Sequence, residues 1–304
     1  MQSYGGKGTI RPTMRPGRKT TRTGRNKPPV FLLVQLGMAV AAIIIGITAF
    51  RYYGWYEKQE DYEIIAERNL VDEETGSTDD SEKNPAEKKD NDPYLNTVPD
   101  IASLKMQNKD CYGWITIPDT PVNYPVVKCP EEDNEYYLMR NFDGSSGYPG
   151  TIFTEHKSGT SFSAFNTILY GHNMRNGTMF ACIRQYRNRD YADKHEYVYV
   201  YTDRKAMKFK VTRACVIDDR HMSNTYGGYE TDDNRTDFLQ YIDETTVMKT
   251  DEENKDLSIH GPYITLSTCD GIGSNNRFIA IAKLEAEKYY GTNTSRPAAG
   301  TPDN

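Results

Sequence analysis

The sequence predicts a mainly β domain, an antiparallel barrel or sandwich, that follows a single membrane-spanning helix. Residues 30–50 are apolar except for Gln35 and Thr48, and a helix of that length spans roughly 30 Å, the hydrocarbon thickness of a bilayer. From about Pro93 onward, short runs rich in β-branched and aromatic residues alternate with turn signals such as Asp143-Gly144. Short strands separated by turns are typical of barrels and sandwiches.

The basic N-terminal segment, residues 1–29, sets the expected orientation of the chain. It carries eight Lys or Arg and no Asp or Glu, so we expect a disordered cytoplasmic tail. Because it adjoins a membrane span, its expected partner is anionic membrane lipid and not nucleic acid. The protein is therefore predicted to be a single-pass protein of the cell membrane, with everything after Phe50 outside the cell.

The apolar segment 30–50 has an alternative interpretation as a cleaved secretory signal. Such a signal has an apolar region of about 7 to 15 residues and a small-residue cleavage site. Here the apolar segment is longer and is followed at once by an aromatic group that suits a membrane interface, namely Tyr52, Tyr53, Trp55 and Tyr56. This pattern favours an uncleaved anchor.

An acidic, polar stretch separates the membrane segment from the domain. Nine Asp or Glu and three Lys lie between Asp72 and Asp92, which accounts for the net charge of −6. Residues 51–93 are expected to form an extracytoplasmic juxtamembrane segment and linker, beginning with a short helix over 52–70. The catalytic domain is expected over 94–290, and a disordered polar tail over 291–304.

Two helices and eight strands are expected within the domain. One helix, over 94–108, leads into it, and the spacing of Phe238, Leu239 and Ile242 predicts another over 233–245. The strands are expected at residues 113–117, 122–127, 150–153, 167–170, 197–202, 207–216, 263–268 and 278–283.

The five cysteines follow no metal-binding spacing. An odd number outside the cytoplasm leaves at least one unpaired, and Cys269 is the candidate for a reactive thiol. The other four, Cys111, Cys129, Cys182 and Cys215, are interpreted as buried small hydrophobic residues, with one or two disulfides as the alternative. The five histidines are too scattered to indicate a zinc site, and no metal or organic cofactor is expected.

The run from Ile264 to Cys269 is predicted to be a strand that presents a thiol at its end. His172 is the candidate proton partner of this thiol, and Arg277, on the following strand, is the candidate that stabilises an oxyanion. A thiol, an imidazole and a guanidinium together indicate covalent acyl transfer through a thioester.

Six sequence blocks resemble the class B sortases, membrane-anchored cysteine transpeptidases of Gram-positive bacteria. In chain order the blocks are WITIP, YPVV, NEYYL, GTIF, YGHNM and TLSTC, and they begin at residues 114, 124, 134, 150, 170 and 265. The inserted helix over 233–245 is also similar to class B, whereas the interval between Cys269 and Arg277 is shorter than is usual in the family. The resemblance implies an eight-stranded sortase-type β-barrel with a few helices.

The resemblance also implies a role for each candidate residue. Cys269 would be the nucleophile, His172 the proton donor and acceptor, and Arg277 the group that stabilises the oxyanion or the substrate. Asn173, Ser267 and Thr268 are candidates for substrate binding, and structural roles for these three stay open.

The implied function is transpeptidation. Such an enzyme cleaves a C-terminal sorting motif of secreted proteins at a Thr carbonyl and transfers them to an amine of a peptidoglycan precursor or cross-bridge. Three alternatives stay open: a pilin-polymerising sortase, a hydrolytic cysteine peptidase, and a non-catalytic membrane-tethered binding module.

Overall fold

The computed structural model describes residues 30–72, 92–218, 229–250, 257–269 and 275–290. The predicted cytoplasmic tail, most of the acidic linker and the predicted C-terminal tail lie outside the described residues. The chain forms two compact units, Met1–Arg51 and Tyr52–Asn304.

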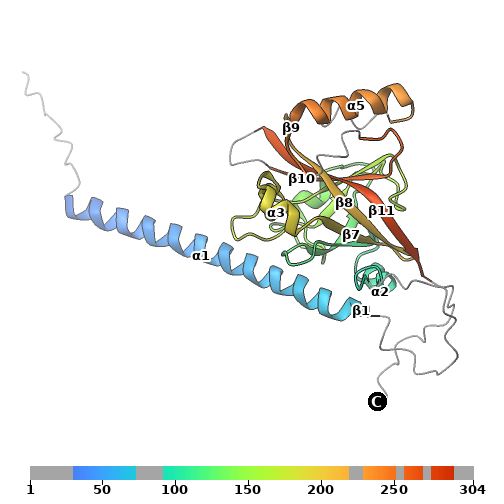
Figure 1. Cartoon of the computed structure of the whole chain (residues 1–304). Coiled ribbons are helices and arrows are strands. Elements are labelled where there is room, and N and C mark those ends of the chain that lie inside the picture. Colours follow the sequence, from blue (N-terminus) through green and yellow to red (C-terminus); the bar gives the residue numbers. More distant parts are fainter. Residues whose placement is uncertain (1–29, 73–91, 219–228, 251–256, 270–274, 291–304) are drawn as a thin grey trace, which may run out of the picture. The chain divides into compact units, whose positions relative to one another are not determined.

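The N-terminal helix α1 runs from Val30 to Asn69 (Figure 1). In its first part, residues 31–50, apolar side chains are exposed all around the helix. An exposed apolar surface of this extent is suited to lipid and not to water, and the helix is long and apolar enough to cross a membrane once. The helix continues through residues 52–69, as the sequence predicted.

Eight strands close into a β-barrel, which confirms the predicted fold class. Around the ring the order is β11, β10, β6, β5, β4, β3, β7 and β8, and β8 closes it by pairing with β11. Closure leaves no unpaired edge around the ring. The strands are β3 Cys111–Thr116, β4 Asn123–Lys128, β5 Ile152–Thr154, β6 Asn166–Tyr170, β7 Tyr197–Tyr201, β8 Lys205–Asp218, β10 Tyr263–Cys269 and β11 Asn276–Tyr289.

Two neighbouring pairs in the ring are parallel, so the expectation of a wholly antiparallel sheet is wrong. β4 pairs with β5, and β6 pairs with β10, in the parallel sense. Parallel neighbours need a connection long enough to bring the chain back to the same end of the sheet. Long connections follow both β4 and β6, and the second parallel pairing positions the candidate site.

Smaller elements lie around the barrel. β9 adds to β8, and β1 pairs with β2 in a separate two-stranded ribbon. Their bounds are β9 Thr246–Lys249, β1 Leu70–Asp72 and β2 Thr97–Pro99, and the short helices are η2 Tyr136–Met139, η3 Ala181–Arg187 and α3 Arg189–Lys194.

The helix expected over 94–108 is shorter than predicted. α2 spans only Ile101–Gln107, because the preceding residues form β2. Pro99 disfavours a helical conformation in the residue before it. The Asp100 carboxylate accepts a hydrogen bond from the backbone N–H of Ser103, which caps the helix at that point.

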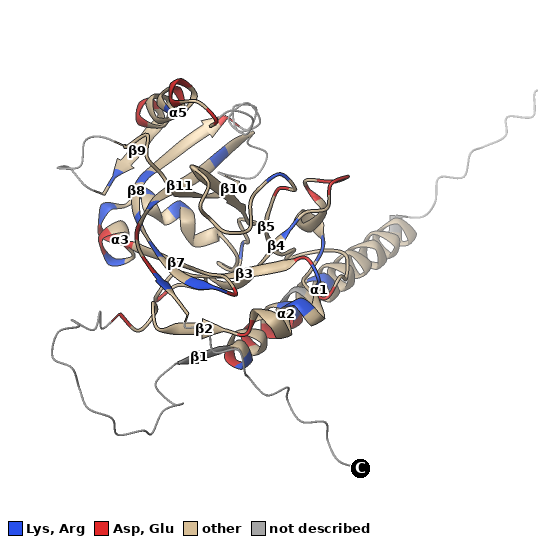
Figure 2. Cartoon of the chain, turned by 90° about the vertical axis from the view of Figure 1, so that its right-hand side faces the viewer, with Lys and Arg blue, Asp and Glu red and all other residues tan. Residues whose placement is uncertain are grey.

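Side chains along β10 and β11 alternate between the barrel interior and an outer face. Leu266 lies in the interior core, whereas Ile279 belongs to a second cluster outside the ring. Helix α5, Asp232–Thr245, covers this outer face with apolar residues that include Phe238 and Ile242, and it begins within one residue of its predicted start. The acidic residues of α5 are exposed and appear red in Figure 2.

The second part of α1 packs against the barrel. Tyr62 and Ala66 are buried in the main core cluster, and the Tyr62 ring meets the ring of Tyr124 edge-on, with centroids 5.4 Å apart. The sequence analysis expected residues 51–93 to form a juxtamembrane segment and linker. Within that range, the part of α1 from Tyr52 to Asn69 falls in the same compact unit as the barrel.

A fragment of residues 94–304 is expected to unfold at a lower temperature than a fragment of residues 52–304. The difference should be about 10 °C, because removing the helix uncovers the apolar surface that Tyr62 and Ala66 bury. Thermal unfolding followed by circular dichroism measures it. A 52–304 fragment with Tyr53→Ala, a change at an exposed position of the same helix, serves as the control. Equal unfolding temperatures for the two fragments would contradict this packing.

Candidate active site

Cys269 is the last residue of β10 and the only cysteine that is not buried; all five are described, and all are free thiols. The alternative with disulfides is therefore wrong. Burial raises the pKa of the Cys111 thiol to about 12 and those of Cys129 and Cys215 to about 11. These thiols are inert at neutral pH, whereas Cys269 is open to a reaction partner.

Arg277 lies directly opposite Cys269 on β11. The two residues are paired in the antiparallel register of β10 and β11, and residues paired in this way project from the same face of a sheet. The guanidinium Nη1 is 2.9 Å from Cys269 Sγ. The guanidinium, which is always charged, thus donates a hydrogen bond to the sulfur of the one cysteine that is not buried. Both residues therefore lie at the same end of the β10–β11 pair.

His172 reaches the same place through the parallel pairing of β6 and β10. Tyr170 is paired with Ser267, and the backbone N–H of Gly171 continues the ladder by donating to the Ser267 carbonyl at 3.1 Å. His172 follows the end of β6 by two residues, and Cys269 is the last residue of β10. The pairing therefore brings the loop that carries His172 to the end of β10, where the Asn173 amide donates to the Cys269 carbonyl oxygen at 2.9 Å.

The His172 imidazole is held by a backbone carbonyl. Its Nε2 is 2.6 Å from the carbonyl oxygen of Leu138, which can only accept, so Nε2 carries a proton and donates it. Nδ1 is then the nitrogen that gains and loses a proton. The ring also contacts the ring of Tyr148, with centroids 4.9 Å apart.

Burial lowers the pKa of His172 below its ordinary value. The Leu138 carbonyl opposes this effect by favouring the protonated ring, and the charge of Arg277 lowers the pKa further. The neutral imidazole is therefore the majority form near pH 7, and the imidazolium is a minority form.

The three candidates for substrate binding differ in their contacts. The Asn173 side-chain amide donates to the Cys269 carbonyl oxygen at 2.9 Å, which ties the loop after β6 to the end of β10. The Ser267 and Thr268 hydroxyls are buried, and neither has a hydrogen-bond partner within the part of the chain that the structure describes. Asn173 thus connects the two segments in this structure.

Among the described residues, no group of three or more His, Cys, Asp or Glu is placed to hold a metal ion.

The sequence analysis missed the segment 136–151, which lies between β4 and β5 and supplies both Leu138 and Tyr148. Any residue type at position 138 could supply this backbone carbonyl, so the residue type in the sequence could not indicate its role. Gly150 is the one indirect signal: its φ is +72°, and a Cβ there would lie 2.6 Å from the Leu138 oxygen. Only glycine combines this conformation with this close approach.

Comparison with known proteins identifies the family. A family profile described as a sortase domain matches residues 115–285, more than half of the chain, so the chain belongs to the sortase family. Its activity is that of a cysteine transpeptidase.

The relatives narrow the assignment to class B. Sortase B of Listeria monocytogenes is 30% identical over 238 residues, which are 77% of this chain and 90% of that protein. The structure of sortase B from Bacillus anthracis matches 77% of this chain and 98% of its own, with a TM-score of 0.58 and 26% identity. A Staphylococcus aureus sortase B–substrate complex matches 61% and 84%, with a TM-score of 0.54 and 27% identity. The chain is a class B sortase.

Substitution of Gly150 is expected to impair the enzyme more than substitution of Gly144. Both residues have positive φ, but a Cβ at Gly144 meets nothing within 4 Å, whereas at Gly150 it strikes the carbonyl that holds His172. Gly150→Ala should lower kcat/KM by about tenfold or more, and Gly144→Ala should show only backbone strain of about 1 kcal/mol in stability. Steady-state kinetics and thermal unfolding of both variants measure this. Equal effects would contradict the close packing.

Proposed function

We propose that Cys269 is the nucleophile of this transpeptidase, that His172 carries the proton, and that Arg277 stabilises negative charge. The observation that carries the proposal is the contact of 2.9 Å between Arg277 Nη1 and Cys269 Sγ. It lies at the end of β10, to which the β6–β10 pairing and the Asn173 hydrogen bond bring the loop that carries His172.

In the first half-reaction the Cys269 thiolate attacks the carbonyl carbon of the Thr in a sorting motif. The tetrahedral intermediate collapses when the C–N bond breaks, and the imidazolium of His172 gives its Nδ1 proton to the departing amine. The products are a thioester on Cys269 and the released C-terminal peptide. Nε2 keeps its proton throughout and donates it to the Leu138 carbonyl oxygen, which fixes the ring in one orientation.

In the second half-reaction an amine attacks the thioester carbon. The neutral Nδ1 of His172 now accepts the proton that the amine loses, and the Cys269 thiolate leaves. The new amide bond joins the secreted protein to its acceptor, and the pair returns to its starting charge state. Atoms and protons balance without any further reagent.

Arg277 serves the pair in two successive ways. Before attack its charge stabilises the thiolate, and during attack it is within reach of the oxygen that becomes negative beside Sγ. A preorganised donor of this kind contributes about 3 kcal/mol of transition-state stabilisation in acyl transfer.

The partners we propose are secreted proteins with a C-terminal sorting signal and an amine of cell-wall peptidoglycan. The proposed location follows from α1, which anchors the enzyme in the cell membrane by one span. The eight basic residues before the span support a cytoplasmic N-terminus, in contact with anionic lipid, and an extracellular barrel.

Intact mass spectrometry of the full-length enzyme in detergent micelles, incubated with a panel of sorting-motif peptides, tests the catalytic assignment. We expect an adduct of the N-terminal part of one peptide on the wild type and none on Cys269→Ala. Arg277→Ala should slow adduct formation by about 10²- to 10³-fold. Arg204→Ala, at an exposed position away from the site, is the control and should react at the wild-type rate.

The release of that adduct separates the possible acceptors. Rapid release by a short peptidoglycan-type peptide amine supports wall anchoring, whereas release only by the lysine of a pilin peptide would support pilin polymerisation. Equal release with and without amine would indicate a hydrolytic peptidase. An adduct that persists in Cys269→Ala would overturn the nucleophile assignment.

The pH dependence follows from the direction of the His172 shift. Reaction requires the thiolate together with the imidazolium, so the acidic limb of kcat/KM should report the lowered pKa of His172 and lie below pH 6.5. In Arg277→Gln the charge that lowers this pKa is absent, so the limb should move to higher pH. Kinetics in constant-ionic-strength buffers measure both profiles. A limb that moves to lower pH in Arg277→Gln would contradict the assigned electrostatics.

A further inference from the structure

We propose that Tyr62, assisted by Lys58, is a positioning residue for His172, so that the membrane-proximal part of α1 holds the catalytic histidine in its working orientation. Neither residue contacts the reacting atoms. They act through the segment 136–151, which supplies the Leu138 carbonyl and the Tyr148 ring. The proposal rests on the proposed role of His172.

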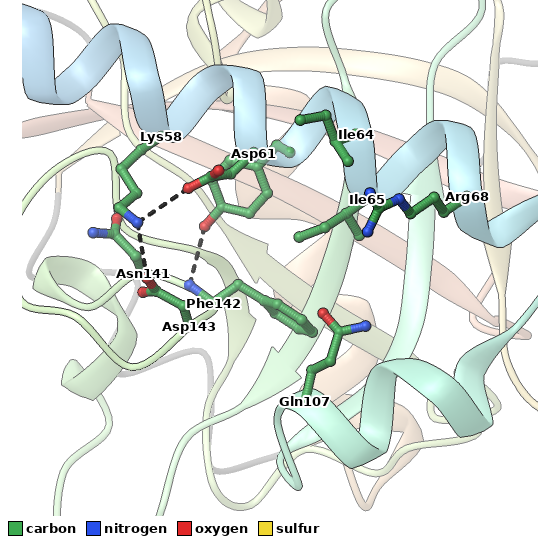
Figure 3. Close-up of a pocket in the computed structure, with 10 residues that line it drawn as sticks. Lys58, Asp61, Ile64, Ile65, Arg68, Gln107, Asn141, Phe142 and Asp143 are labelled. Carbon is green, nitrogen blue, oxygen red and sulfur yellow. Dashed lines mark hydrogen bonds and ion pairs between the residues drawn. The ribbon is translucent and has the colours of Figure 1, made fainter. Parts of the chain in front are cut away.

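Tyr62 connects α1 to this segment through hydrogen bonds of its hydroxyl group. The side chain is only 3% exposed, and its hydroxyl donates to the Gly150 carbonyl oxygen at 2.6 Å. The Tyr62 hydroxyl oxygen also accepts a hydrogen bond from the backbone N–H of Phe142 at 3.3 Å (Figure 3). One buried hydroxyl thus joins two parts of the segment that would otherwise bury unpaired backbone groups, which is costly.

Lys58 makes a second contact one turn earlier on α1. Its ammonium is 2.8 Å from the carboxylate of Asp143 and 3.0 Å from that of Asp61. These groups line a cleft of about 440 Å³ between α1 and the segment (Figure 3). Because ion pairs that water reaches contribute little, Lys58 is the weaker of the two anchors.

The segment transmits the position of Gly150 to Leu138. Gly150 packs directly against the Leu138 carbonyl oxygen, which a Cβ would approach to 2.6 Å. The two arms of the segment are bonded to each other, since Thr151 donates its N–H to Tyr137 at 3.2 Å and its hydroxyl to the Arg140 carbonyl at 3.0 Å. A shift of Gly150 therefore moves the oxygen that binds His172 Nε2.

A separate set of contacts connects α1 to the other side of the histidine. Gln59 lies 3.3 Å from the Tyr124 hydroxyl, which accepts from the backbone N–H of Met179 at 3.0 Å. Met179 forms a β-bridge with Asn173, the neighbour of His172 whose amide donates to Cys269. α1 thus supports the loop that carries the histidine as well as the carbonyl that holds its ring.

The test compares Tyr62→Phe with Tyr53→Phe in the full-length enzyme in detergent micelles. Tyr62→Phe keeps the buried ring and removes only the hydroxyl, whereas Tyr53 is exposed on the same helix. We expect kcat/KM of Tyr62→Phe to fall about tenfold, the cost of a misplaced catalytic group. We also expect the acidic limb to move to lower pH, because the Leu138 bond that raises the pKa of His172 is weakened.

The position of the acidic limb of the kcat/KM profile distinguishes a displaced His172 from a variant that is partly unfolded. The groups that act on the imidazole are the Leu138 carbonyl, the Tyr148 ring and the charge of Arg277, and only the first two depend on the segment. A fall in activity that matches the unfolded fraction, with an unmoved limb, would overturn the proposal. If Tyr62→Phe does not fold, Lys58→Gln is measured in its place, with a smaller shift in the same direction expected and an unmoved limb again counting against the proposal.

His172→Ala separates this proposal from the catalytic assignment. If that variant keeps wild-type activity, the assignment of His172 fails, and the positioning role fails with it. If His172→Ala is inactive while Tyr62→Phe has the wild-type rate and profile, only the positioning role is overturned.

Discussion

The active site depends on the parallel pairing of β6 with β10. This pairing brings the loop that carries His172 to the end of β10, although His172 and Cys269 are far apart in the sequence. The Gly171 N–H donates to Ser267 beyond the last paired residues, and the Asn173 amide donates to the Cys269 carbonyl oxygen. The antiparallel β10–β11 pair places only Arg277 against the thiol, so the proposed proton transfer depends on the β6–β10 register.

Three features of the fold act on the pKa of His172. Burial of the ring lowers it, the Leu138 carbonyl partly restores the charged form, and the charge of Arg277 lowers the pKa further. Arg277 also donates a hydrogen bond to Cys269 Sγ at 2.9 Å. Under the mechanism proposed above, the enzyme works through a minority protonation state of His172, and these three features set its population.

The sequence predicted the elements whose patterns are local. The apolar span, the strands of the barrel, α5, and the candidates Cys269, His172 and Arg277 all follow from residue types at characteristic positions. The helix expected over 94–108 was too long because Pro99 and the capping Asp100 outweighed its helical pattern. Leu138 and Tyr62 could not be predicted in this way, since a carbonyl contact and the packing of α1 depend on residues that are distant in the sequence.

Because four of the five cysteines are buried, the folded protein has one thiol that reagents can reach. Burial raises the thiol pKa of four cysteines, namely Cys111, Cys129, Cys182 and Cys215. Only Cys269 is partly exposed to solvent. We therefore expect a thiol-alkylating reagent to label Cys269 in the folded protein and to leave the four buried thiols unmodified. An oxidant should act at the same sulfur atom and leave the barrel intact.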